Sequence, residues 1–187
     1  MIHPWRLIDS RYLVRDRWLT LRADRCQIPT GAVVDPYYVQ ESPDWVQVVA
    51  FDAQERILVT RQYRHAAVVV CAEFPCGTVE SGELPEQAAR RELLEETGCT
   101  VGTLSLLSTL YSNPARDCNR IYVFVATETC CAQPQRLDAT ECIEFGFLPV
   151  PEVLAQIDDG QFSQALHVAS LFLALRSRGM LPVPGSR

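Results

Sequence analysis

The sequence contains no long apolar run. Its longest apolar stretch near the middle, Ala66–Ala72, is far shorter than the roughly 18 to 20 apolar residues of a transmembrane helix. The first residues include Trp5, Arg6 and Asp9 but no apolar signal core. These absences argue against a membrane partner and against export. We therefore expect a cytoplasmic protein.

The sequence also lacks an excess of positive charge. Its 17 Lys and Arg residues against 23 Asp and Glu residues leave a formal net charge of −6. Proteins that bind nucleic-acid polymers present basic surfaces to the phosphates, so we expect no nucleic-acid partner. A small anionic ligand is still compatible with this charge, because it needs only a few cationic groups or a metal ion.

Several common catalytic and metal-binding arrangements are missing as well. No CxxC pair indicates a zinc site, and no Ser-His-Asp or Cys-His arrangement indicates covalent catalysis. The eight cysteines are an even number, which leaves a disulfide framework as an alternative. Because Cys71, Cys99 and Cys142 lie in apolar or strand-like runs, we expect reduced, packed thiols instead. Cys130 and Cys131 are expected in a loop.

The chain has 187 residues, enough for one hydrophobic core, and strand-like segments cover much of it. Two β-rich runs, Val46–Phe51 and Arg56–Thr60, flank the turn-like segment Asp52–Glu55 and predict a hairpin. Further strand-like segments are Tyr12–Leu13, Trp18–Leu21, Ala23–Ile28, Tyr37–Val39, Ile121–Ala126 and Ile143–Leu148.

Three helices are expected. The first, Pro85–Thr97, has proline in its first turn and Gly98 as its C-terminal stop. The others are Val150–Ile157 and Ser163–Arg178. Strands, a central helix, more strands and terminal helices together indicate a mixed α/β (α+β) fold, with sheets packed between helices.

The helix Pro85–Thr97 carries an acidic face. Glu92, Glu95 and Glu96 have i, i+3, i+4 spacing and share one side of the helix. Partly buried carboxylates about 4 Å apart repel each other by about 4 kcal/mol at an effective dielectric constant near 20. A hard divalent cation such as Mg²⁺ offsets that repulsion. The alternative from spacing alone is a solvated acidic face, with Arg91 and Glu95 as an ordinary ion pair.

The surrounding stretch resembles the Nudix box, Gly-x5-Glu-x7-Arg-Glu-U-x-Glu-Glu-x-Gly-U, in which U is an apolar residue. Leu93 fills the first U, and Cys99 fills the second, where Ile, Leu or Val is usual. The fixed positions of the box are filled by Gly77, Glu83, Arg91, Glu92, Glu95, Glu96 and Gly98.

The resemblance implies a Nudix-type α/β/α sandwich with a mixed sheet, and a metal-dependent pyrophosphatase that uses Mg²⁺ or Mn²⁺. It implies that Glu92 and Glu96 are metal ligands, that Glu95 binds a second metal ion or water, and that the Cys76 carbonyl is a further ligand. Glu95 and Glu96 are thus implied to take part in catalysis. The resemblance also implies that Arg91 and Glu83 pair to hold the loop and helix, and that Gly77 and Gly98 meet backbone requirements.

Flanking motifs resemble the ADP-ribose pyrophosphatase branch of this family. Arg61-Gln-Tyr-Arg64 precedes the box, Glu73-Phe-Pro-Cys-Gly77 leads into it, and Pro114 follows it at the spacing of a marker of ADP-ribose hydrolysis. By this resemblance Arg64 contacts a phosphate, and Arg61 belongs to the same substrate-binding motif. Glu73 would contact the metal site or a ribose, with a structural role as the alternative.

Other residues take expected roles from the same resemblance. Trp18 and Tyr38 would stack on the base, with ordinary packing as the alternative, and Arg116 would contact a phosphate or simply be a solvated loop residue. Glu141 would supply the general base or a metal-bound carboxylate from an acidic loop. That loop is less acidic than in many relatives, so a plain surface charge is the alternative for Glu141.

The resemblance implies two parts, an N-terminal strand region over residues 1–45 that forms a homodimer and a Nudix hydrolase domain over 46–187. The expected reaction converts ADP-ribose to AMP and ribose 5-phosphate. Alternatives are another nucleotide sugar such as GDP-mannose, or a non-catalytic nucleotide-sensing Nudix domain. The intact metal ligands, the acidic charge and the lack of an additional DNA-binding segment argue against the sensor.

Overall fold

The computed structural model describes residues 1–181 and divides the chain into two compact units. The first comprises Met1–Asp44 with Tyr111–Arg120, and the second comprises Trp45–Leu110 with the segment from Ile121 onward. The predicted domains, 1–45 and 46–187, had placed the segment 111–120 in the second part. Residues 182–187 of the second predicted domain lie outside the described residues.

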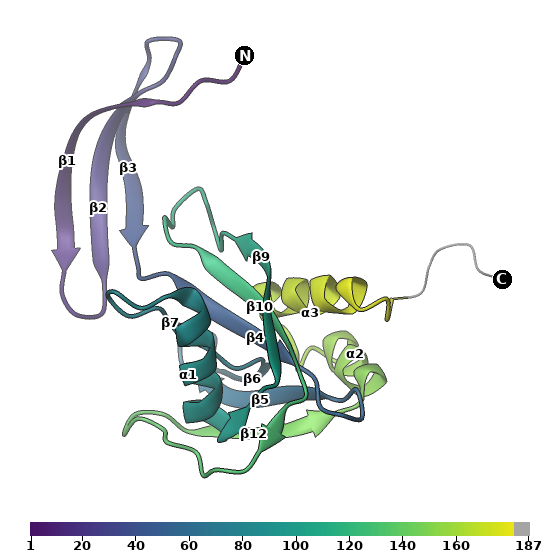
Figure 1. Cartoon of the computed structure of the whole chain (residues 1–187). Coiled ribbons are helices and arrows are strands. Elements are labelled where there is room, and N and C mark those ends of the chain that lie inside the picture. Colours follow the sequence, from purple (N-terminus) through teal and green to yellow (C-terminus); the bar gives the residue numbers. More distant parts are fainter. Residues whose placement is uncertain (182–187) are drawn as a thin grey trace. The chain divides into compact units, whose positions relative to one another are not determined.

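The first unit is built on a three-stranded antiparallel sheet in the order β1-β2-β3 (Figure 1). Its strands are β1 (Arg6–Arg15), β2 (Thr20–Gln27) and β3 (Val33–Glu41). The segment 111–120 is hydrogen-bonded to β3: the Tyr37 hydroxyl donates to the Ala115 carbonyl at 2.6 Å, and the Gln40 amide donates to the Arg116 carbonyl at 2.9 Å. The N-terminal antiparallel strand region is thereby confirmed.

The second unit holds a four-stranded mixed sheet in the order β7-β4-β10-β9, in which β4 and β10 are parallel. A three-stranded sheet in the order β12-β5-β6 lies beside it in the fold, and β8 pairs with β11. The strands are β4 (Trp45–Ala50), β5 (Ile57–Arg64), β6 (Val69–Glu73), β7 (Cys76–Thr78), β8 (Cys99–Thr100), β9 (Thr103–Leu110), β10 (Ile121–Thr127), β11 (Cys130–Cys131) and β12 (Ile143–Leu148).

The part of the chain that the structure describes has three helices: α1 (Pro85–Thr97), α2 (Val150–Asp158) and α3 (Ala165–Ser177). Helix α1 lies on one side of the β4 sheet and α3 on the other (Figure 1). The alternation of β4 explains these layers, because successive strand residues face opposite sides of a sheet. Val48 packs in the core with Leu93 of α1, whereas Val49 packs in the core with Leu171 of α3. The predicted α/β/α sandwich is confirmed.

The predicted hairpin between the β4 and β5 segments is wrong. These strands belong to different sheets, and at the turn between them Phe51 and Ile57 form an isolated bridge. The edges of β4 are occupied by β7 and β10, so β5 pairs elsewhere. In the turn between them, the Asp52 carboxylate accepts hydrogen bonds from the Gln54 and Arg56 amides at 2.9 and 2.8 Å.

The expectation that the cysteines are reduced is wrong for Cys99 and Cys131, which form a disulfide. The two residues lie opposite each other in the antiparallel β8–β11 pair, which brings their side chains together. Cys130 and Cys131, predicted in a loop, form the short strand β11. The free thiols are those of Cys26, Cys71, Cys76, Cys118, Cys130 and Cys142.

Within residues 1–181, the helices are all too short or too polar to cross a membrane.

Candidate active site

Helix α1 presents its acidic residues to a pocket of about 380 Å³ in the second unit. The helix begins where the Gln87 side chain accepts a hydrogen bond from the Leu84 amide at 3.0 Å, and it ends at Gly98, whose φ of 66° is left-handed. The residues that line the pocket are Trp45, Gln62, Arg64, Cys76, Gly77, Thr78, Glu80, Arg91, Glu92, Glu95, Glu96, Arg136, Asp138 and Glu141.

The pocket therefore brings together six of the residues that the sequence singled out for metal binding, catalysis or phosphate contact. They come from β5, β7, α1 and the loop before β12, which are far apart in the chain. These six residues are Arg64, Cys76, Glu92, Glu95, Glu96 and Glu141.

Arg91 connects the loop before α1 to the acidic face of the helix. Its guanidinium donates to both carboxylate oxygens of Glu83 at 2.9 Å and to the Thr78 carbonyl at 2.9 Å. It also donates to Glu92 Oε1 at 2.8 Å and to Glu95 Oε2 at 3.1 Å. A planar guanidinium can serve several acceptors in fixed directions, so Arg91 orients two pocket carboxylates and holds the loop at once.

The pocket carboxylates have too little positive charge around them. The pKa of Glu96 is raised to about 9, first by burial and then by the nearby Glu92 and Glu141 carboxylates. The Cys76 amide, which donates to Glu96 Oε2 at 3.2 Å, opposes the rise. Burial likewise raises the pKa of Glu92 to about 7, with contributions from Glu95 and Glu141 against the opposing effect of Arg91. Such a group of carboxylates favours a bound cation.

The donor atoms fit a hard divalent cation. Glu92, Glu95, Glu96 and Glu141 line the pocket with Cys76. Their carboxylates and the Cys76 carbonyl are oxygen donors of the kind that Mg²⁺ and Mn²⁺ prefer. Gly77 leaves the space that the Glu92 carboxylate occupies, because a Cβ at this position would lie 2.0 Å from Glu92 Cδ. These residues could therefore hold Mg²⁺ or Mn²⁺.

A buried network lies behind Arg64. The Arg64 guanidinium makes a two-pronged ion pair with Glu73, in which Nε donates to Oε1 at 2.9 Å and Nη2 donates to Oε2. Glu73 is only 2% exposed and does not line the pocket. The resemblance implied that Glu73 contacts a metal site or a ribose. In the structure Glu73 instead supports Arg64, whose pKa it raises.

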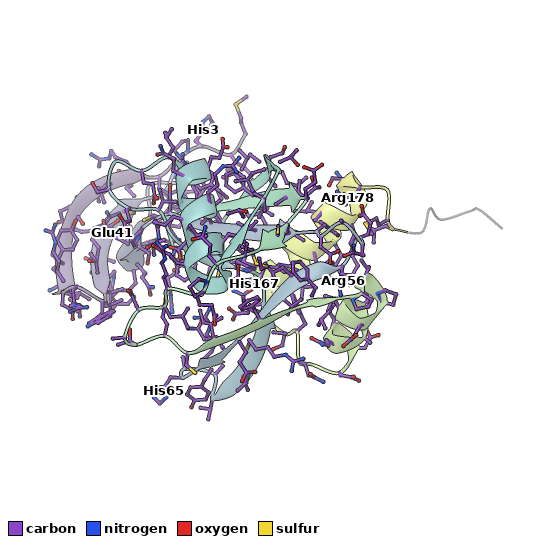
Figure 2. All side chains as sticks on the ribbon, turned by 60° about the horizontal axis from the view of Figure 1, so that its bottom comes forward. His3, Glu41, Arg56, His65, His167 and Arg178 are labelled. Atoms are coloured by element: carbon purple, nitrogen blue, oxygen red, sulfur yellow. A yellow bond between two sulfur atoms is a disulfide. The ribbon has the colours of Figure 1, made fainter. Side chains whose placement is uncertain are left out.

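His167 of α3 belongs to the same network, although sequence reasoning assigned it no role. Its Nδ1 accepts a hydrogen bond from the Phe74 amide at 2.9 Å, and its Nε2 lies 3.9 Å from Glu73 Oε2. Burial lowers the pKa of His167 to about 4, so the ring is neutral at pH 7. Figure 2 shows His167 among the central side chains of the view and His65 at its edge.

Glu73, Cys76 and His167 bring metal-ligand atoms within 4.8 Å of one another. Their hydrogen bonding opposes a metal ion at that place. His167 Nδ1 accepts the Phe74 amide, so the ring hydrogen is on Nε2, the nitrogen that faces Glu73. Burial raises the pKa of the Cys76 thiol, which keeps it protonated. We interpret the cluster as support for the start of β7, which carries the Cys76 carbonyl.

The other residues predicted to bind substrate lie elsewhere. Arg61 lines a separate hollow of about 240 Å³ with Glu144 and Phe145. Tyr38 and Arg116 line a pocket of about 340 Å³ in the first unit, together with Leu13, Leu19, Leu21 and Gln40.

Trp18 and Pro114 also belong to the first unit and do not line that pocket. Trp18 lies in the turn after β1, is 77% exposed and carries the Arg17 guanidinium 4.1 Å from its ring centroid. Pro114 is exposed in the segment 111–120.

The chain is similar to known proteins over most of its length. The family model described as the NUDIX domain matches residues 43–167, and the model of the nucleoside diphosphate sugar hydrolase N-terminal domain matches residues 5–40. The ADP-ribose pyrophosphatase of Bacillus subtilis (strain 168) is 28% identical over 179 residues, which cover 92% of this chain and 96% of that protein. The ADP-sugar pyrophosphatase of Mus musculus is 50% identical over 103 residues, which cover 49% of this chain and 47% of that protein.

A solved structure shares the fold. It is described as the crystal structure of ADP compounds hydrolase, matches with a TM-score of 0.84, and is 21% identical. The match covers 97% of this chain and 99% of the other chain.

Proposed function

The chain belongs to the Nudix hydrolase family, and we propose that it hydrolyses ADP-ribose to AMP and ribose 5-phosphate with the help of Mg²⁺ or Mn²⁺. Its N-terminal and Nudix segments make it a pyrophosphatase of nucleoside diphosphate sugars. Members of this family typically depend on a divalent metal ion. Beyond this, we propose that ADP-ribose is the preferred substrate and that Mg²⁺ or Mn²⁺ is the metal ion. The roles given to individual residues are also part of the proposal.

The observation that carries the proposal is a pair of pocket carboxylates, the half-buried Glu92 and the buried Glu96, whose pKa values are raised to about 7 and about 9 among further oxygen donors. Glu92 and Glu96 would hold the cation with the Cys76 carbonyl, and Glu95 would assist from the next position on the helix. When bound, the cation neutralises the pyrophosphate, polarises a P–O bond and lowers the pKa of water.

The chain's own residues then complete the reaction. Arg64, held by Glu73, donates hydrogen bonds to a substrate phosphate and keeps it against the acidic face of α1. A Glu141 carboxylate oxygen accepts the proton of the attacking water. Water adds across the P–O–P linkage, so that one phosphate leaves on AMP and the other on ribose 5-phosphate.

ADP-ribose is favoured by two observations, and a third favours a nucleotide in general. Pro114 follows the box at the spacing of the ADP-ribose branch, and the Bacillus subtilis relative that is similar over nearly the whole chain is an ADP-ribose pyrophosphatase. In the first unit, the pocket of Tyr38 and Arg116 combines an aromatic ring, a guanidinium and leucine side chains. Those groups suit stacking on a nucleotide base.

A substrate panel tests the proposal. Purified protein is given ADP-ribose, GDP-mannose, other nucleotide sugars, dinucleoside polyphosphates or oxidised nucleoside triphosphates with Mg²⁺ or Mn²⁺, and products are identified by mass. We expect AMP and ribose 5-phosphate from ADP-ribose at the highest kcat/KM, and no turnover in excess chelator. Glu96→Gln is the matched control. It should lose at least about 100-fold in kcat/KM while its melting temperature is retained, since the volume is kept and one ligand is removed.

Three results would contradict all or part of the proposal. A higher kcat/KM for GDP-mannose would reject ADP-ribose but keep the mechanism. Wild-type turnover in Glu96→Gln would reject the metal-binding role of Glu96. No hydrolysis of any compound in the panel would favour the nucleotide-sensing alternative.

We also propose that the first unit forms a homodimer. All ten residues of β1 are exposed, and this strand presents apolar side chains, among them Leu7, Tyr12, Leu13 and Val14. Exposed apolar surface of this kind marks interaction sites. The mass of the native protein by light scattering should be close to twice the 21.0 kDa of one chain. A monomer at micromolar concentration would contradict this.

A further inference from the structure

The segment of residues 132–142, called the strap below, runs from β11 to β12 and delivers Glu141 to the acidic pocket. It contains no helix or strand. Three of its residues, Arg136, Asp138 and Glu141, line the pocket. Because the strap has no helical or strand hydrogen bonding of its own, its position depends on hydrogen bonds to neighbouring elements.

Those bonds go to the C-terminal end of α1. The last four carbonyls of an α-helix have no partner within the helix. The Arg136 amide of the strap donates to the Glu95 carbonyl at 2.8 Å, and the Gln135 side-chain amide donates to the Glu96 carbonyl at 2.6 Å. The strap thus caps the helix that carries the acidic residues.

Gly98 permits the close approach of the strap. A Cβ at this position would lie 1.8 Å from the Gln133 carbonyl oxygen, whose residue in turn donates its amide to the Gly98 carbonyl at 3.2 Å. The disulfide between Cys99 and Cys131 joins the same two segments immediately before the strap begins.

The Gln135 side chain also makes a hydrogen bond to β12. Its Nε2 donates to the Glu96 carbonyl and also to the Ile143 carbonyl at 3.0 Å. An amide nitrogen carries two hydrogens, so both donors are used. The Gln135 side chain therefore links Glu96, near the end of α1, to Ile143, the first residue of β12. Glu141 lies between Gln135 and Ile143 in the sequence.

We propose that Gln135 is a positioning residue that holds Glu141 at the acidic pocket. This inference rests on the proposed function, in which Glu141 accepts the proton of the attacking water. Gln135 does not line the pocket and acts through the strap. Displacement of a catalytic group by about 1 Å can reduce turnover about 100-fold, so loss of both hydrogen bonds should be visible in kcat.

The test uses Gln135→Met, which keeps the length of the side chain but has neither donor nor charge. The matched control is Gln133→Met, in the same strap, because the exposed Gln133 side chain only accepts a long bond from Arg136 Nη2 at 3.4 Å. With ADP-ribose and saturating Mg²⁺, we expect kcat of Gln135→Met to fall about 10- to 100-fold with a smaller change in KM. The control should keep wild-type kcat.

A double variant separates positioning of Glu141 from a general effect on α1. If Gln135 acts through Glu141, Gln135→Met combined with Glu141→Gln should be no slower than Glu141→Gln alone. Two losses that multiply would overturn the proposal, because they would show that Gln135 acts elsewhere. An unchanged kcat in Gln135→Met would overturn it as well.

Amide hydrogen exchange gives a readout that does not depend on catalysis. In Gln135→Met, exchange should increase within 132–142 while residues 85–97 of α1 stay protected. If the wild type hydrolyses no substrate, the proposed function fails, and this measurement still decides whether Gln135 holds the strap. Unchanged exchange in the strap would contradict the positioning role, and loss of protection throughout α1 would assign Gln135 to helix stability.

Discussion

At the scale of single residues, the two glycines of the box have different physical roles. Gly98 adopts a left-handed φ of 66° and leaves room for the Gln133 carbonyl of the strap. Gly77 has no such φ, and its role is purely spatial, since the Glu92 carboxylate occupies the place of the missing Cβ. The sequence interpretation of both as backbone requirements is therefore incomplete for Gly77, which makes room for a proposed metal ligand.

We expect Gly77→Ala to impair catalysis more than folding. The new methyl group would lie about 2 Å from the Glu92 carboxylate, so the side chain must move away from the pocket. Steady-state kinetics should show kcat/KM lowered about 100-fold, with more Mg²⁺ needed for half-maximal rate. Gly146→Ala is the control, because nothing lies within 4 Å of a Cβ there. Equal activity of the two variants would contradict the spatial role of Gly77.

At the scale of elements, α1 acts with the loops at its two ends. Arg91 fastens the preceding loop through Glu83 and the Thr78 carbonyl, and the strap fastens the following end through Gln135. The acidic face is held from both sides. Arg91 is consequently expected to matter both for stability and for the geometry of Glu92.

Arg91→Lys should lower both stability and metal affinity. A lysine ammonium cannot make the two-pronged contact with Glu83 and also reach Glu92 and Glu95. We expect the free energy of unfolding in urea to fall by about 1 to 3 kcal/mol. The Mg²⁺ concentration for half-maximal rate should rise in the same variant.

Arg90→Lys provides the matched comparison for that experiment. Arg90 is the preceding helix residue, and its exposed ion pair with Glu86 is worth about 0 to 1 kcal/mol. It should therefore retain activity and nearly all of its stability. If Arg91→Lys and Arg90→Lys behave alike, the connecting role of Arg91 is wrong.

The elements that could be predicted from the sequence are those specified by local chemistry. The helix Pro85–Thr97 has the predicted ends, because proline and Gly98 mark them in the sequence itself. The strand Ile143–Leu148 is also found where it was predicted. The hairpin from β4 to β5 failed because β4 takes its parallel partner, β10, from more than seventy residues away, and no local signal specifies such a pairing.

The same distinction applies to the site. Box spacing was enough to bring Glu92, Glu95 and Glu96 to one face. Glu141, which only the family resemblance singled out, lines the same pocket in the structure. Neither Gln135 nor His167 belongs to a motif, and each gains its contacts only when distant segments meet. Phe74 and His167, for instance, are 93 residues apart in the chain.

At the scale of the whole molecule, the acidic pocket links folding to pH and to metal binding. The pKa is raised from 4.5 to about 9 for Glu96 and from 4.5 to about 7 for Glu92. Between pH 4.5 and each raised pKa, the folded protein without metal therefore holds more protons on that group than the unfolded chain does. Stability then falls as pH rises from about 4.5 to about 9, by about 1.4 kcal/mol per pH unit for each extra proton held. The charged carboxylates lower the stability of the folded state most at alkaline pH, where no proton neutralises them.

A divalent cation should remove this cost, because it competes with protons for the same oxygens. Because a ligand that binds only the folded state stabilises it, we expect Mg²⁺ at a concentration on the order of 10 mM to raise the melting temperature more at pH 8.5 than at pH 5.5. Calorimetric scans of the chelator-treated protein, with and without Mg²⁺, measure the difference. In the double variant Glu92→Gln, Glu96→Gln, both the fall in stability with pH and the Mg²⁺ effect should disappear. A Mg²⁺ effect of equal size at both pH values would show that the cation does not bind the carboxylates of α1.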